Sequence, residues 1–283
     1  MNPMTSAARS GARRGLFEFR QSFVTTTDII GIVVPNLILL VVMIFMREAT
    51  IGQTGFSLGT MSLSSVLGMT VAFNGMMTVS QQLAVEREDG TLLRAKAIPN
   101  GVFGYLIGKI VLVACLTVIS MLALLIPGMM LFEGLALNSV GGWFTLVWVF
   151  VLGLVATMPI GAVLGSLFEN PRNVGVMMLP IMGLVAVSGI FGPLGEMSGW
   201  MQFVGQLFPI YWLGLGMRSA LLPDNMAVIE IGGSWRTLET IGVLGVWAVI
   251  GLVLAPVVMR RMARRESGAN MAARREKALQ RVG

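Results

Sequence analysis

The stretch WFTLVWVFVLGLVATMPIGAVLGSLF, residues 143–168, contains no charged side chain. A helix needs about 20 mostly apolar residues to cross the hydrocarbon layer of a membrane, and this stretch exceeds that length. The whole chain of 283 residues is 55% hydrophobic and only 12% charged, with a mean hydropathy of +0.81. An ordinary soluble domain carries about a quarter charged residues. The sequence therefore predicts an all-α integral membrane protein.

Windows of similar length, with no charge near their centres, occur at six places: 28–46, 60–80, 103–131, 143–168, 174–192 and 238–259. They predict six transmembrane helices within one transmembrane domain, residues 28–259. Residues 1–27 form an amino-terminal tail with an interfacial helix, and residues 260–283 form a basic tail.

The Lys and Arg residues predict the orientation of these helices, because positive residues remain on the cytoplasmic side. With the amino terminus inside, all but three of the 20 basic residues fall on that side; the exceptions are Arg47, Arg218 and Arg236. We therefore expect a multi-pass protein of the bacterial plasma (inner) membrane with both termini in the cytoplasm.

Three flanking segments suggest contact with the membrane. Leu16, Phe19 and Phe23 recur at helical spacing within residues 13–24, which indicates a helix in the cytoplasmic interface; a basic flank that merely anchors the first span is the alternative. The basic tail could lie on anionic lipid or be solvated. Residues 193–223 are external yet apolar and are broken by Gly and Pro, which predicts short re-entrant helices.

The chemistry that is missing excludes several classes of function. The chain has no His, and its single cysteine, Cys115, allows no intrachain disulfide. No ionisable residue lies near the centre of a predicted span, so ion coupling within the membrane is not expected. Gly104–Ile110 resembles a P-loop but lacks its spacing and its hydroxyl, and no basic face is suited to nucleic acid. We expect a non-enzymatic protein without a bound cofactor, whose energy for any uphill transport comes from a partner.

A polar loop follows the second predicted span: Glu86-Arg87-Glu88-Asp89-Gly90-Thr91-Leu92-Leu93-Arg94-Ala95-Lys96-Ala97-Ile98-Pro99. The pattern indicates that the span continues past the lipid, stops at Gly90 and restarts as a short helix ended by Ile98-Pro99. Apolar residues beside basic ones on that helix suit a groove on a soluble partner. Small-residue pairs, Gly104 with Gly108 and Gly161 with Gly165, permit close helix packing.

The loop and the span pattern together resemble the membrane subunits of type-2 ABC exporters, over nearly the whole chain. Residues 188–194, SGIFGPL, and 207–212, LFPIYW, are similar to the turn and re-entrant segment of the drug and antibiotic efflux branch. The resemblance implies an external segment that includes Gly192, Pro193, Pro209, Tyr211 and Trp212. It also implies a cytoplasmic coupling helix between the second and third spans, built from Glu86, Arg87, Glu88, Asp89, Gly90, Thr91, Leu92 and Leu93.

The resemblance further implies a permease that forms half of a translocation pathway. Its partners would be two copies of an ABC ATPase, which bind ATP-Mg, a second permease subunit in a homodimer or heterodimer, and membrane lipids. The substrate would be a hydrophobic or amphipathic small molecule. Export of a lipid-linked glycan and a non-transporting scaffold or sensor are the alternatives.

Overall fold

The structure is a computed structural model that describes residues 3–52, 55–88, 91–96, 98, 100–136, 138–167 and 175–265. Its regular elements in these ranges are helices, apart from an isolated bridge between Thr50 and Ser57. The main helices are α1 (Pro3–Gln21), α2 (Thr26–Phe45), α3 (Leu58–Phe73), α4 (Val79–Glu88), α5 (Thr91–Lys96), α6 (Gly101–Leu131), α7 (Val140–Leu167), α9 (Met178–Ala186), α10 (Gly199–Leu207), α11 (Pro209–Leu221) and α12 (Thr237–Arg265).

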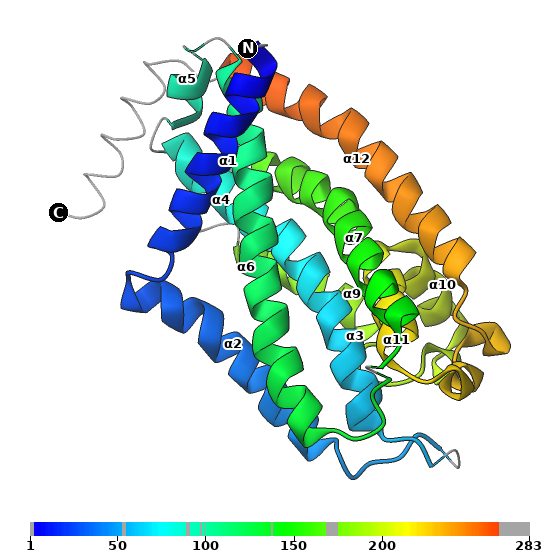
Figure 1. Ribbon diagram of the computed structural model, residues 1–283. Coiled ribbons are helices and arrows are strands. Elements are labelled where there is room, and N and C mark those ends of the chain that lie inside the picture. The colour runs from blue at the N-terminus through cyan, green and yellow to red at the C-terminus, as the bar shows by residue number, and fades with distance from the viewer. Residues whose placement is uncertain are drawn as a thin grey trace.

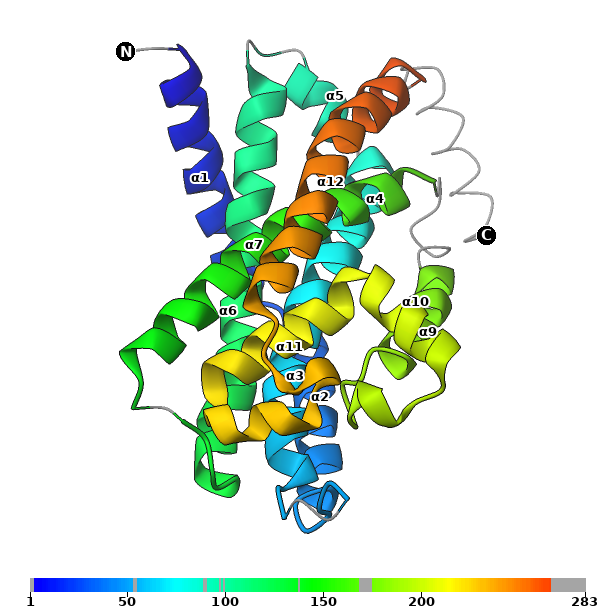
Figure 2. The same ribbon diagram turned by 90° about the vertical axis from the view of Figure 1, so that its right-hand side faces the viewer.

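These helices form an elongated bundle in which α3 and α6 run side by side through the middle (Figure 1). α2 packs against α6 on one side, and α7 and α12 pack together on the other. The amino terminus and the end of α12 lie at the same end of the bundle (Figure 2). The prediction that both termini lie in the cytoplasm stays a prediction.

Four of the described helices are long and apolar enough to cross a membrane: Leu58–Glu86, Gly101–Leu131, Val140–Leu167 and Thr237–Val258. Each coincides with a predicted window. The windows at 28–46 and 174–192 contain shorter apolar helices, Ile29–Phe45 and Gly175–Ala186. The chain is thus an all-α membrane protein, and the count of six spans stays a prediction.

One predicted boundary was wrong. The helix in the fifth window ends at Ala186 rather than Gly192, because Gly189 turns the chain with a positive φ of 65°. The helix of the second window continues past Ser80 to Glu88, as predicted for the part beyond the lipid, and α3 joins α4 through a π-helical segment, Asn74–Thr78. The predicted 13–24 helix exists, but as part of the longer α1, which ends at Gln21. Residues 266–283 of the predicted basic tail lie outside the described residues.

The core of the bundle is centred on α3, whose residues Gly59 to Ala72 are all buried. α11 lies directly across α3, and its backbone touches α3 at Gly68: a Cβ on Gly68 would come within 2.4 Å of the Leu213 carbonyl carbon. α12 is the opposite case, with only 17% of its most apolar window buried in the protein. An apolar helix that faces outward is typical of a protein whose solvent is lipid.

Residues 187–236, which we call the cap, connect α9 to α12 (Figure 2). They contain three short 3-10 helices, η3 (Leu194–Glu196), η4 (Asp224–Ile229) and η5 (Ile231–Gly233), together with α10 and α11. The short helices expected in this segment are present. Nearly every residue of α11 is buried against α3, α7 and α12, so this broken backbone is covered by protein, as membrane depth requires.

Candidate functional site

The polar loop after α3 folds as an elbow, made of α4 and α5, at the end of the molecule where α6 begins (Figure 1). The backbone is helical at Arg87 and Glu88 and again at Leu92 and Leu93, and a new helix starts at Thr91 as expected. Asp89 and Gly90 lie outside the described residues. Thr91 Oγ1 accepts a hydrogen bond of 3.0 Å from Arg94 Nη2 within α5.

Glu86 anchors the elbow to α6. One carboxylate oxygen lies 2.6 Å from Lys109 Nζ, and the other accepts a hydrogen bond from the Tyr105 hydroxyl. The side chains of Lys109 and Glu86 are only 12% and 13% exposed. Because few water molecules can reach this pair, its attraction is stronger than that of a surface ion pair.

Lys109 also ties α1 to the same point. Its Nζ lies 2.7 Å from Glu18 Oε2, and Arg14 Nε lies 2.7 Å from Glu18 Oε1. Burial alone would raise the pKa of Glu18, but the hydrogen bonds and charges of Lys109 and Arg14 outweigh it and hold that pKa below its ordinary value. Glu18, Lys109 and Glu86 therefore form one chain of charges, which we call the charged bridge, from α1 through α6 to the elbow.

Glycines bring α1 and α6 close enough for these contacts. A Cβ on Gly11 would come within 2.0 Å of the Gly104 carbonyl oxygen, and one on Gly15 within 2.3 Å of the Gly108 carbonyl oxygen. The two helices thus touch backbone to backbone, as small residues four apart allow. The predicted role of Gly104 and Gly108 in close packing is confirmed, and their partner is α1.

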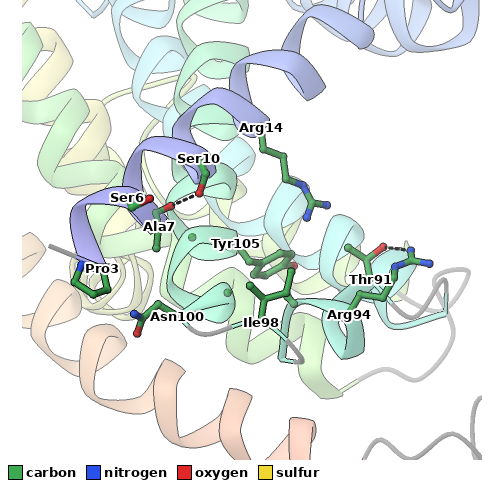
Figure 3. A pocket seen from close by; sticks show the side chains of 14 residues that line it. Pro3, Ser6, Ala7, Ser10, Arg14, Thr91, Arg94, Ile98, Asn100 and Tyr105 are labelled. Atoms are coloured by element: carbon green, nitrogen blue, oxygen red, sulfur yellow. Dashed lines mark hydrogen bonds between the residues drawn. The ribbon is translucent and has the colours of Figure 1, made fainter. Parts of the chain in front are cut away.

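A pocket of about 540 Å³ opens beside the elbow, between α1, α5 and the start of α6 (Figure 3). Arg14, Thr91 and Arg94 supply its polar wall, and Ile98 and Tyr105 supply apolar surface. A concave surface with both kinds of side chain is suited to receive part of another protein.

The five predicted residues of the external segment fall within the cap but do not gather at one place. Gly192 and Pro193 lie in the turn before η3, and Pro209 is the first residue of α11. Tyr211 and Trp212 are buried, at 0% and 3% exposure. Trp212 Nε1 donates to the Gln206 carbonyl at 2.6 Å, and the Arg236 guanidinium lies 4.7 Å from the centroid of the Trp212 ring system.

Sequence reasoning missed the most buried charges in the cap. Arg218 was assigned to the outer side of the membrane without a partner, and its side chain and that of Glu230 are both 0% exposed. Arg218 Nε lies 2.6 Å from Glu230 Oε1, and Nη2 donates to Oε2 at 3.1 Å. An isolated Arg inside the apolar run of α11 was the available signal, because such a residue needs a partner when it is buried.

Comparison with known proteins agrees with this architecture. No curated protein matches the chain. The family model described as ABC-2 family transporter protein matches residues 52–256, which include the elbow, the central helices, the cap and most of α12. Since this match covers well over half of the 283 residues, the chain belongs to the ABC-2 family of transporter proteins.

Proposed function

We propose that this chain, as the permease subunit of an ABC transporter, exports a hydrophobic or amphipathic compound such as a drug, an antibiotic or a lipid-like molecule. A separate ABC ATPase would supply the energy by hydrolysing ATP-Mg. The observation that carries the proposal is the anchored elbow at one end of the bundle: the short helix α5 follows α4 and contacts α6, and Glu86 of α4 is paired with Lys109 of α6. Force applied to such a helix reaches the membrane-spanning bundle directly.

The elbow end would face the cytoplasm of a bacterium, with α2, α3–α4, α6, α7, α9 and α12 as six spans. Two observations support this orientation. Both the amino terminus and the end of α12 lie at the elbow end (Figure 2), and the basic residues Arg9, Arg94 and Arg261 belong to segments there. The apolar helices of α2 and α9 are short, so their flanking residues or a neighbouring subunit would complete their passage through the membrane.

A second permease subunit, identical or different, would complete the pathway, and two ATPase copies would drive the pair. α2 supports this proposal, because one apolar residue after another along it is exposed, among them Val33, Leu37 and Phe45. Lipid covers such a face in a monomer, whereas the facing subunit covers it in a dimer. A hydrophobic substrate would pass between two such faces.

Co-purification tests the function first. The tagged chain is expressed together with the products of its neighbouring genes, purified in mild detergent and assayed for ATP hydrolysis with candidate compounds. We expect a bound ATPase whose turnover rises with the exported compound. A chain that purifies without an ATPase under these conditions would contradict the exporter function and favour a scaffold.

The elbow is tested by Glu88→Arg, which reverses a charge in the coupling helix. Glu48→Arg is the matched control, because Glu48 is exposed in the loop at the opposite end of the bundle. We expect the Glu88 variant to insert normally but to lose ATPase binding and transport, while the Glu48 variant keeps both. Equal transport by the two variants would remove the coupling role from the elbow.

A further inference from the structure

The buried pair in the cap connects four parts of the chain. Beyond its contacts with Glu230, Arg218 Nη1 donates to Ser65 Oγ of α3 at 2.7 Å and to the Gly189 carbonyl at 3.3 Å. Gly189 lies in the turn at 187–190, which we call the α9 turn. One guanidinium therefore holds α11, the Glu230 segment, α3 and the α9 turn together.

The contacts of Arg218 differ in strength. The Nη2 hydrogen bond to Glu230 and the close Nε–Oε1 approach form an ion pair without access to water, and removing one partner from such a pair is costly. The bond to Ser65 is short, and α3 and α11 also touch through their backbones at Gly68. The bond to Gly189 is the longest of the set, and its acceptor is an uncharged carbonyl. The α9 turn is thus the part that Arg218 holds least firmly.

Packing around the α9 turn also indicates that this turn is held less firmly than the other parts. Ile190, 1% exposed, rests in the space left by Gly214 of α11, where a Cβ would come within 3.0 Å of the Ile190 side chain. Gly189 gives the turn its positive φ, and the preceding helix α9, Met178–Ala186, has few contacts with α11. The contacts of α11 with the α9 turn thus include one long hydrogen bond and one apolar contact of good fit.

We propose that Arg218 is a positioning residue that locks α3, α11 and the Glu230 segment into a single unit and latches that unit to the α9 turn, which separates from it when the transporter opens. The proposal rests on the proposed function for what drives the opening. The force that opens the transporter would be transmitted through the helix Leu58–Glu86, because Ser65 lies near one end of this helix and the anchored elbow is at the other. Movement of the elbow would then displace α11 relative to the α9 turn.

Accessibility of the α9 turn tests the latch without any ATPase. Ser188 is 1% exposed in the closed arrangement, so Ser188→Cys in a Cys115→Ala background gives one thiol for a membrane-impermeant maleimide. The paired change Arg218→Met with Glu230→Met removes the latch and leaves no unpaired buried charge. We expect it to raise the labelling rate at least tenfold. Asp224→Asn, which weakens only an exposed contact to Trp235 in the same cap, should leave the rate unchanged.

Gel filtration shows whether the paired variant is folded. If it is not, Ser65→Ala replaces it, since that change removes one uncharged partner and should raise labelling about threefold. Labelling of a folded latch variant at the parent rate overturns the proposal. In the transporter assembled with its ATPase, trapping the nucleotide-bound state should raise labelling of Cys115→Ala/Ser188→Cys, and no rise would overturn the α9 turn as the part that opens. If no ATPase assembles, the proposed function fails, while labelling of the isolated chain still decides the latch.

Discussion

Replacing Lys109 by Met should detach α1 from the bundle, because Glu18 and Glu86 would keep their charges without their shared cation. Removing one partner of a fully buried ion pair costs about 3 to 5 kcal/mol, whereas an exposed pair contributes roughly 0 to 1 kcal/mol. Lys109, Glu86 and Glu18 are 12%, 13% and 23% exposed, so the charged bridge lies closer to the buried case. We expect a loss of about 2 to 3 kcal/mol in the free energy that holds α1 in place, which is roughly a 30- to 160-fold larger detached population.

Limited trypsin digestion in detergent measures that population. α1 carries several arginines along its length, and cleavage of a transiently opened segment follows its open population when opening and closing are fast. The Lys109→Met variant should therefore be cleaved within α1 roughly 30 to 160 times faster than the parent protein. Lys109→Arg retains the cation and should be cleaved nearly as slowly as the parent.

A triple variant separates charge from packing. Adding Glu18→Gln and Glu86→Gln to Lys109→Met removes the uncompensated carboxylates, and we expect most of the lost protection to return. Unchanged cleavage of Lys109→Met would refute the reasoning, because it would mean that the glycine contacts alone hold α1 to α6. A triple variant as labile as the single one would show that lost packing by the Lys109 stem, rather than charge, is the cause.

Three further changes test the rest of the structure. Gly15→Leu places a Cβ within 2.3 Å of a backbone oxygen of α6 and should expose α1 to trypsin, whereas Gly31→Leu, with nothing within 4 Å, should have no effect. The pKa of Glu18 is lowered in the folded protein, so its ion pairs stabilise the attachment of α1 fully above the unfolded pKa of Glu18, and this stabilisation is lost as pH falls through the lowered folded value. Pepsin cleavage of α1 should therefore rise across that acidic range, and Glu18→Gln should make cleavage depend less on pH. Trp212→Phe leaves a carbonyl of α10 without its 2.6 Å donor and should lower the thermal midpoint in detergent through a loss of about 1 to 2 kcal/mol.

The spans and the elbow were predictable because each depends on a local and strict physical requirement. Lipid accepts no unpaired backbone or isolated charge, so an uncharged run such as 143–168 has few structures available to it. The elbow was found for a similar reason: a charged run interrupted by Gly90 and ended by Pro99 cannot continue as an apolar helix. The end of the fifth window was misjudged because the residues after Ala186 are as apolar as those before it, and only the turn at Gly189 sets the limit.

The charged contacts were not predictable, because their partners are far apart in the sequence. Glu18 and Lys109 are 91 positions apart, and Arg218 and Ser65 are 153 apart. No periodic pattern relates residues at such distances, and a basic residue near an apolar segment is ordinarily assigned to an aqueous flank. Arg218 could therefore be recognised as buried only after α3, α11 and the segment carrying Glu230 had been brought together.

The helix Leu58–Glu86 is held at its middle as well as near both ends. Its π-helical segment, Asn74–Thr78, lies against α7, where a Cβ on Gly75 would come within 2.0 Å of Thr157 Oγ1. Shortly after this segment, Ser80 Oγ donates to the Gly161 carbonyl at 2.7 Å. π-helical turns widen the helix by one residue and recur at functional sites, and this one coincides with a close approach to α7.

We expect the helix Leu58–Glu86 to act as a lever, with its contact to α7 as the pivot. Displacement of the Glu86 end in one direction would then move the Ser65 end in the other, so the elbow and the latch would shift in opposite senses. Thr157→Leu places a larger side chain at the contact between α7 and the helix Leu58–Glu86. It should weaken the transfer of movement from the elbow to the latch while leaving both ends of the helix intact. When it is added to Cys115→Ala/Ser188→Cys, the nucleotide-dependent rise in labelling should shrink even though the ATPase stays bound. A rise equal to that of the parent would mean that the two ends communicate by another route.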